Sequence, residues 1–110
     1  SDIEPKEAIK NVLEEKKSDA FFEQLVIGIS DNQDVIDTSI RNNLEKWTLE
    51  RIGNVDRILL RIAIYEMEYM PEIPLNVSLD EAIELAKIYG DENSSKFING
   101  VLSKVKESSL

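Results

Sequence analysis

The chain has 110 residues, enough for one small domain, and it contains neither cysteine nor histidine. A disulfide framework, a thiolate metal site and a histidine general base are therefore excluded, and the reducing cytoplasm is the expected location. With 13 basic and 22 acidic residues, the net charge is −9, which argues against tight unaided binding to a phosphate backbone. We expect no signal peptide and no membrane span, because the first residues are polar and no apolar run is long enough.

Apolar residues recur at helical spacing along the chain, and no segment alternates with period two, so we predict an all-α fold. The first predicted helix starts at Pro5, which suits a first helical turn, and it ends near Lys16 and Lys17. Ser18 or Asp19 is expected to cap the second helix.

The second predicted helix contains Gly28, which is expected to admit a close neighbour. A polar break at residues 30–33 separates it from a third predicted helix that ends near Trp47. We interpret Trp47 and Tyr65 as core residues. The apolar stripe of the second helix is broad and consists of Phe21, Phe22, Leu25, Val26 and Ile29.

Residues 54–70 are apolar on most sides, which predicts the central helix of the fold. The remaining polar stripe holds Arg57, Arg61 and Glu68, which lie within about 40° of each other at 100° per residue. The two arginines have two interpretations. They either form surface ion pairs with Glu68 and Asp56, or they make a small basic strip on an acidic domain.

Pro71 and Pro74 predict a non-helical connection after the central helix. Ser78 and Glu81 have the spacing of a capping box, which predicts a helix that starts near Ser78 and stops at Gly90.

The last predicted helix begins after Asn93 or Ser94, and Gly100 is expected where another helix packs closely. Phe97 begins its apolar stripe and has two interpretations, a core residue or a ring at the stripe's edge that stacks on an unpaired base. In the second case Lys96 would meet a phosphate.

The paired carboxylates of the chain are typical of solvated helix faces and caps, and no Gly-rich phosphate loop accompanies them. The acidic residues between Asp31 and Asp34 lack the glycine and glutamate of a calcium loop. We therefore expect that the chain has no enzymatic activity, no cofactor and no metal site.

Three segments resemble, in order and spacing, the bacterial NusB family of transcription antitermination proteins, with details similar to a Bacillus member. The likeness is strong over residues 50–105 and includes the Ile73-Pro74 loop and Gly90. The segments are NVDRILLRIAIYE at 54–66, DEAIELAK at 80–87 and KFINGVL at 96–102.

The resemblance implies a single helical domain over residues 1–110, with subdomains at 1–48 and 49–110. It implies binding to the boxA element of nascent RNA, notably in ribosomal RNA operons, together with the ribosomal protein NusE and within the antitermination complex of RNA polymerase. By position it implies partner contacts at Asp56 and Arg57, and RNA contacts at Arg61, Glu92, Asn93, Lys96, Phe97 and Asn99.

Family members begin with an arginine-rich helix, and this chain is expected to start after it. We therefore expect RNA binding to depend on NusE, and the broad apolar stripes of the front half leave a homodimer possible. Two alternatives stay open. One is a purely protein-binding or dimerising helical module, which the acidic charge favours. The other is a NusB-like RNA-binding domain of a larger RNA cytosine methyltransferase.

Overall fold

The computed structural model describes residues 4–46 and 48–108, and within these ranges helices joined by loops are the only regular secondary structure, with no strand. The all-α prediction is therefore confirmed. Trp47, which we interpret from the sequence as a core residue, lies outside the described residues. The elements are α1 (Pro5–Glu15), α2 (Asp19–Asp31), α3 (Gln33–Asn42), the short 3-10 helix η1 (Leu49–Arg51), α4 (Asn54–Tyr69), α5 (Leu75–Tyr89) and α6 (Ser94–Ser108).

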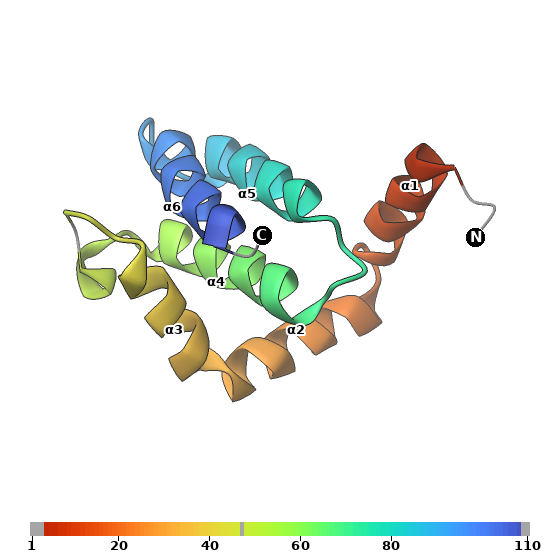
Figure 1. Ribbon diagram of the computed structural model, residues 1–110, viewed down its shortest axis with the longest axis horizontal. Coiled ribbons are helices and arrows are strands. Elements are labelled where there is room, and N and C mark those ends of the chain that lie inside the picture. Colours follow the sequence, from red (N-terminus) through yellow and green to blue (C-terminus); the bar gives the residue numbers. More distant parts are fainter. Residues whose placement is uncertain (1–3, 47, 109–110) are drawn as a thin grey trace.

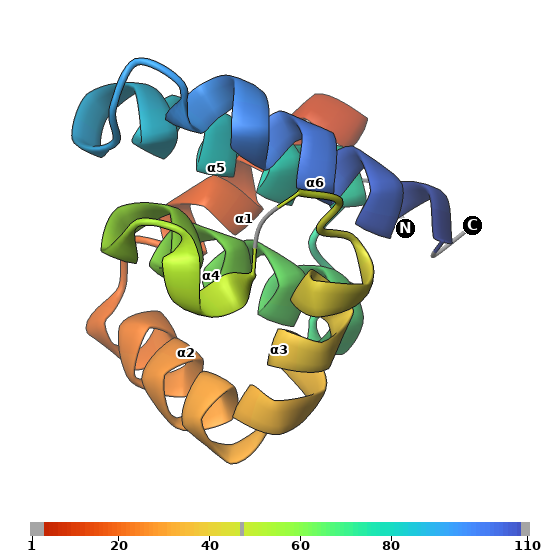
Figure 2. The ribbon, with the colours of Figure 1, turned by 90° about the vertical axis from the view of Figure 1, so that its left-hand side faces the viewer.

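Helix α4 is central, as its apolar surface predicts. It packs against α5 and α6 on one side and against α2 and α3 on the other. Figure 2 shows this arrangement, with α4 between the α5–α6 pair and the α2–α3 pair. Fully buried aliphatic side chains from α3, α4 and α6 meet there: Ile36, Ile40, Leu60, Ile64, Ile98 and Leu102.

Helix α1 lies apart from this core, at the end of the molecule opposite the loop that joins α5 to α6 (Figure 1). Pro5 occupies its first turn, as predicted, yet none of its residues is buried. Its apolar stripe only partly packs on the core, through Ile9, Val12 and Leu13. Ser18 caps the next helix as predicted, because its side chain accepts a hydrogen bond from the Phe21 N–H at 3.1 Å.

A cleft of about 400 Å³ separates α1 and α2 from α4 and α5, and a buried carboxylate lies in its wall. Glu66 is only 2 % exposed, and its Oε1 accepts hydrogen bonds from Lys16 Nζ and Ser78 Oγ, each at 2.8 Å. Lys16 also binds Glu81. Glu66 Oε2 has no hydrogen-bond partner among the described residues, so Lys16 is the main compensation for this buried charge.

The predicted capping box of α5 is wrong. The helix already begins at Leu75 after Pro74, so Ser78 lies within it rather than before it. The Ser78 side chain is buried and donates a hydrogen bond to the Glu66 carboxylate, instead of accepting one from a backbone N–H of the helix. The physical reason is that a buried carboxylate needs donors, and a serine one turn into α5 supplies one.

The two helical glycines differ. A Cβ at Gly28 would overlap the ring and hydroxyl of Tyr65, which confirms the predicted close neighbour. A Cβ at Gly100 would meet no heavy atom within 4 Å, so the close packing predicted there is wrong. Gly100 is exposed because α6 turns the neighbouring residues Ile98 and Val101 toward the core instead.

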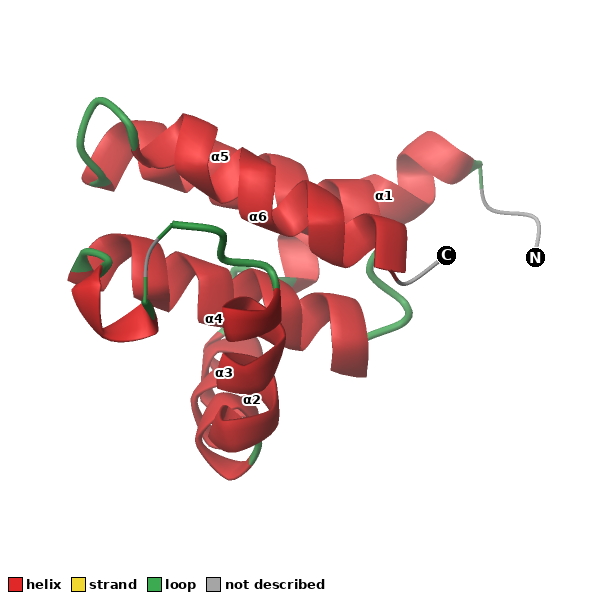
Figure 3. Ribbon diagram, turned by 60° about the vertical axis from the view of Figure 1, so that its left-hand side comes forward, coloured by secondary structure: helices red, strands yellow, loops and turns green. Residues whose placement is uncertain are grey.

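Helix α3 ends at Asn42 rather than near Trp47, because Asn43 closes it. The Asn43 backbone N–H donates to Ile40, and its side-chain amide donates to the Ser39 carbonyl at 2.8 Å. The chain then leaves the helix and forms a loop that runs toward α6 (Figure 3). This loop forms one wall of the site described next.

Candidate functional site

A groove of about 510 Å³ lies between the loop after α3 and the first turns of α6. Its two walls are far apart in the sequence and meet only because α3 and α6 both pack on α4. The groove is lined by Asn43, Leu44, Glu45, Lys46, Asn93, Lys96, Phe97, Gly100, Val101 and Lys104.

The start of α6 is held by a hydrogen-bonded loop. The Asp91 carboxylate accepts the Asn93 N–H at 2.8 Å, and the Ser94 hydroxyl accepts the Asp91 N–H at 2.9 Å. The Asn93 carbonyl accepts the Phe97 N–H at 3.0 Å as α6 begins. These bonds set the direction of the first helical turn, and with it the positions of Lys96 and Phe97 on the groove.

Phe97 is half-buried. It packs against the core and also lines the groove, so it combines features of both interpretations made from the sequence. Leu44 and Val101 add apolar surface beside it, and the missing side chain of Gly100 leaves space one turn further along α6. An aromatic ring at the edge of an apolar groove can stack on a flat partner.

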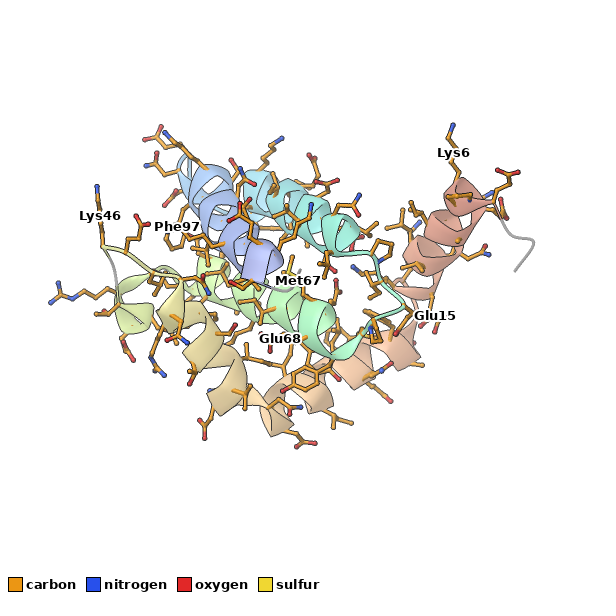
Figure 4. The ribbon with its side chains drawn as sticks, viewed as in Figure 1. Lys6, Glu15, Lys46, Met67, Glu68 and Phe97 are labelled. Atoms are coloured by element: carbon orange, nitrogen blue, oxygen red, sulfur yellow. The ribbon has the colours of Figure 1, made fainter. Side chains whose placement is uncertain are left out.

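Three lysines line the groove. Lys96 and Lys104 are two turns apart on α6, and Lys46 comes from the facing loop. Figure 4 shows Lys46 at the same end of the molecule as Phe97, and Lys6 at the opposite end. Among the described residues Glu45 is the only acidic one in the lining, so these residues give the groove three positive charges and one negative charge, on a chain of net charge −9.

Glu45 forms an ion pair with Lys104 across the groove. The hydrogen bond from Lys104 and the charge of its ammonium group hold the pKa of Glu45 below its usual value. The pair joins residues 59 positions apart in the sequence and connects the loop to α6.

A second, smaller hollow of about 240 Å³ adjoins the groove. Asn93 and Phe97 line both, and Asp56 at the start of α4 lines the smaller one. The structure therefore brings three residues of the predicted RNA set, Asn93, Lys96 and Phe97, close to the predicted partner residue Asp56.

Arg61 lines neither hollow. It makes a bidentate ion pair with Asp37 on α3, at 2.8 and 2.9 Å, and it is 22 % exposed. This hydrogen-bonded carboxylate raises the pKa of Arg61. The ion-pair partner predicted for the arginines was therefore wrong, since Glu68 instead accepts a hydrogen bond from the Ser39 hydroxyl at 2.9 Å.

The remaining predicted residues are outside the groove lining. Arg57 donates to the Leu49 carbonyl at 3.1 Å and to the Asn54 side chain, which fastens η1 to α4. Asn99 accepts from the Ser103 hydroxyl at 3.2 Å, and both Asn99 and Glu92 are exposed. The RNA or partner roles of these residues, like that of Arg61, stay predictions.

Sequence reasoning did not identify Leu44, Lys46, Gly100 and Lys104 as groove residues. Spacing could have revealed two of them, because Lys96, Gly100 and Lys104 follow each other at intervals of four and so share a helix face. Lys46 had no such signal, since it reaches the groove from a loop. Within residues 4–46 and 48–108, no acidic cluster could hold a metal ion and no helix could cross a membrane.

Sequence comparisons with known proteins match this chain over almost its whole length. The model of the NusB family matches residues 2–107. Transcription antitermination proteins NusB of Bacillus thuringiensis (strain Al Hakam), Bacillus cereus (strain AH187) and Bacillus anthracis are each 56% identical over 107 residues, covering 96% of this chain and 82% of theirs.

A solved structure of T. maritima NusB is also similar, with a TM-score of 0.74 and 48% sequence identity. The match covers 76% of this chain but only 59% of that chain, less than two thirds of its length. The resemblance drawn from the three motifs, including its Bacillus-like character, is confirmed.

Proposed function

We propose that this chain, which belongs to the NusB family, takes part in transcription antitermination by binding boxA RNA together with the ribosomal protein NusE. In this proposal it is a cytoplasmic adaptor of the RNA polymerase antitermination complex, with no chemical step of its own. Its relatives bear the name transcription antitermination protein, which supports the general role.

The groove beside α6 is the observation that carries the proposal. It combines the half-buried ring of Phe97 with three lysines, on a chain that is otherwise strongly acidic. Single-stranded RNA is bound by this combination, in which aromatic rings stack on unpaired bases and ammonium groups contact phosphates. A groove for a purely apolar protein segment would have no need of three cations.

The net charge explains why a partner belongs in the proposal. Repulsion between a chain of charge −9 and RNA opposes their approach, and only three lysines in the groove counteract it. The hollow that contains Asp56 shares Asn93 and Phe97 with the groove. A partner bound at Asp56 would therefore lie beside the RNA and could contribute basic residues to the same strand.

Titration of a fluorescent boxA RNA, with and without NusE, tests the function. We expect weak or undetectable binding by the chain alone and clear binding when NusE is present, with a scrambled RNA as the control. Tight and selective binding by the chain alone would refute the partner dependence. If boxA and scrambled RNA bind equally, or neither binds with NusE present, the RNA-binding function is refuted.

Phe97→Ala tests the stacking role within this function. Loss of a stacked ring should weaken RNA binding by about 1–3 kcal/mol. Phe22→Ala is the matched control, because Phe22 is 67 % exposed on α2, outside the groove lining. A loss of about 3–5 kcal/mol in the free energy of unfolding, with unchanged RNA affinity of the folded protein, would assign Phe97 to the core alone.

Asp56→Lys tests the partner site. Asp56 is partly exposed, so the change should cost little stability, whereas reversing a charge at a charged interface should lower NusE affinity. Asp80→Lys on the exposed face of α5 makes the same change elsewhere and should leave NusE binding intact. Equal NusE affinity of the two variants would show that Asp56 does not contribute to the NusE interface.

One observation favours the alternative of a helical module that binds only proteins. Helix α2 exposes three large apolar side chains, Phe22, Val26 and Ile27, each more than half accessible. Such a surface is typical of a protein contact. For that module, the RNA titration would be negative with NusE present, while binding of NusE itself would persist.

A further inference from the structure

Glu45 is the one acidic side chain that the described residues contribute to the lining of the groove, and a negative charge at this position opposes RNA binding. Its side chain is 72 % exposed, and it pairs with Lys104, which is 42 % exposed. The pair removes one of the three lysine charges from the groove. An RNA phosphate approaching Lys104 therefore meets a lysine that is already engaged and a carboxylate that repels it.

We propose that Glu45 is an internal competitor of the RNA: its carboxylate holds Lys104 in the free protein, and a phosphate of the bound strand takes its place. This proposal rests on the proposed function and adds a regulatory element to it. No covalent bond changes in the exchange. The Lys104 ammonium passes from a carboxylate oxygen to a phosphate oxygen, and the Glu45 carboxylate returns to water.

The geometry makes the exchange feasible. Because Glu45 is mostly exposed and lies in a loop, its release uncovers no core and leaves no buried charge. Exposed ion pairs of this kind are weak. The hydrogen bond and charge of Lys104 hold the pKa of the Glu45 carboxylate below its usual value, in keeping with the ion pair between them.

The pair would also make the groove selective. A carboxylate tethered beside its lysine has an effective concentration in the millimolar range, so a free phosphate at lower concentration competes poorly with it. A strand whose base already stacks near Phe97 brings its own phosphates to Lys104 with the same advantage. Glu45 therefore favours ligands that use the ring and the lysines together over small anions.

The arrangement of α6 supports a strand running along the groove. Lys96 and Lys104 are separated by eight residues, or about 12 Å of helix axis, with the open position Gly100 between them. A strand that contacts Lys96 first would pass Gly100 and reach the Glu45–Lys104 pair at the far end.

The test compares Glu45→Gln with Glu84→Gln, in titrations of boxA RNA with NusE present. Glu84 is a matched control, since it is an exposed carboxylate that pairs with Lys87 at 3.3 Å on α5 and its replacement changes the net charge equally. We expect about 1.4- to fivefold tighter RNA binding for Glu45→Gln, which is the strength of exposed ion pairs expressed as a change in affinity, and an affinity close to wild type for the control.

Lys104→Gln completes a double-mutant cycle. In its background, the advantage of Glu45→Gln over the Glu84→Gln control should shrink to what the repulsion between carboxylate and phosphate contributes, because no lysine remains to be freed. Lys104→Gln alone should also lower the slope of log affinity against log salt by about 0.7, the value for one phosphate contact of a single strand. Thermal melts of all variants verify that each is folded.

Three outcomes would overturn the proposal. The first is a gain for Glu45→Gln no larger than for Glu84→Gln, and the second is an equal gain with and without Lys104. The third is weaker binding by Glu45→Gln, which would mean that the pair orders the loop for RNA. If wild type binds and Phe97→Ala is impaired, these results refute the competitor role and leave the proposed function standing. If no variant binds RNA, both fail.

Discussion

Helices α2 and α6 are both rich in apolar residues, yet they are buried to very different extents. In α6 the apolar residues Ile98, Val101, Leu102 and Val105 are buried, whereas in α2 only Phe21 is. Helix α6 packs against both α4 and α5, while α2 packs mainly against α4 and one end of α3. Each helix has two main neighbours, so burial is decided by how extensively the helix packs on them rather than by apolar content.

The same difference in burial separates the front half of the molecule, α1 to α3, from the back half, η1 to α6. Helix α4 is covered by four other helices and buries seven residues, whereas α1 buries none. The exposed large apolar side chains of the described residues are divided evenly between the halves: Phe22, Val26, Ile27 and Val35 in the front, and Ile58, Tyr69, Ile88 and Tyr89 in the back. The halves therefore differ in how much they bury rather than in how much they expose, and stability should reside mainly in the back half.

Leu60→Ala against Val26→Ala is the strongest test of this contrast. Leu60 is fully buried in α4, so its truncation leaves a cavity and should cost about 2–5 kcal/mol of unfolding free energy. Val26 is 52 % exposed, and its truncation should cost less than about 0.5 kcal/mol. Urea denaturation measures both. Similar losses for the two variants would show that α2 is as well packed as α4.

Lys16→Met tests whether one ion pair fastens the front half to the back half. Lys16 is 11 % exposed and compensates the buried Glu66, so its removal should cost about 2–3 kcal/mol. The neighbouring Lys17→Met is the control, because Lys17 is 76 % exposed and its removal should be nearly neutral. Thermal unfolding separates the variants, and an equally neutral Lys16→Met would mean that water compensates Glu66.

The two helical glycines test the packing of α2 and α6 at single positions, Gly28 in α2 and Gly100 in α6. Gly28→Ala introduces a methyl group where Tyr65 packs and should destabilise by about 1–3 kcal/mol. Gly100→Ala adds a methyl group in open space within a helix and should stabilise by about 0.5–1 kcal/mol. Denaturant midpoints give the signs directly. A stabilising Gly28→Ala would show that the contact between α2 and α4 is loose.

The smallest expected effect on stability belongs to Phe22→Ser, because Phe22 is 67 % exposed. Its expected effect is on association. If the front half pairs with a second copy through its exposed apolar side chains, light scattering should show weaker self-association for Phe22→Ser than for wild type. Ile88→Ser, at an equally exposed apolar position on α5, is the control. If the wild-type protein stays monomeric at high concentration, the homodimer hypothesis is refuted.

Local chemistry allowed much of the helical order to be predicted. Pro5, Ser18 and Gly90 act within one helical turn of their own positions, and the structure has helix boundaries at each of them. The central position of residues 54–69 followed from an apolar surface on most sides. Of the six RNA-contacting residues that the resemblance implied, the structure brings Asn93, Lys96 and Phe97 to one groove and leaves Arg61, Glu92 and Asn99 outside its lining.

Only the tertiary structure decided which distant groups meet. Three such pairs are separated by 24, 12 and 59 residues, respectively: Arg61 with Asp37, Ser78 with Glu66, and Glu45 with Lys104. No helical or strand period links such positions, because each pairing depends on how whole helices pack on α4. For the same reason Gly28 and Gly100 look alike in sequence but differ in space. A glycine's environment is set by the neighbour that packs on it.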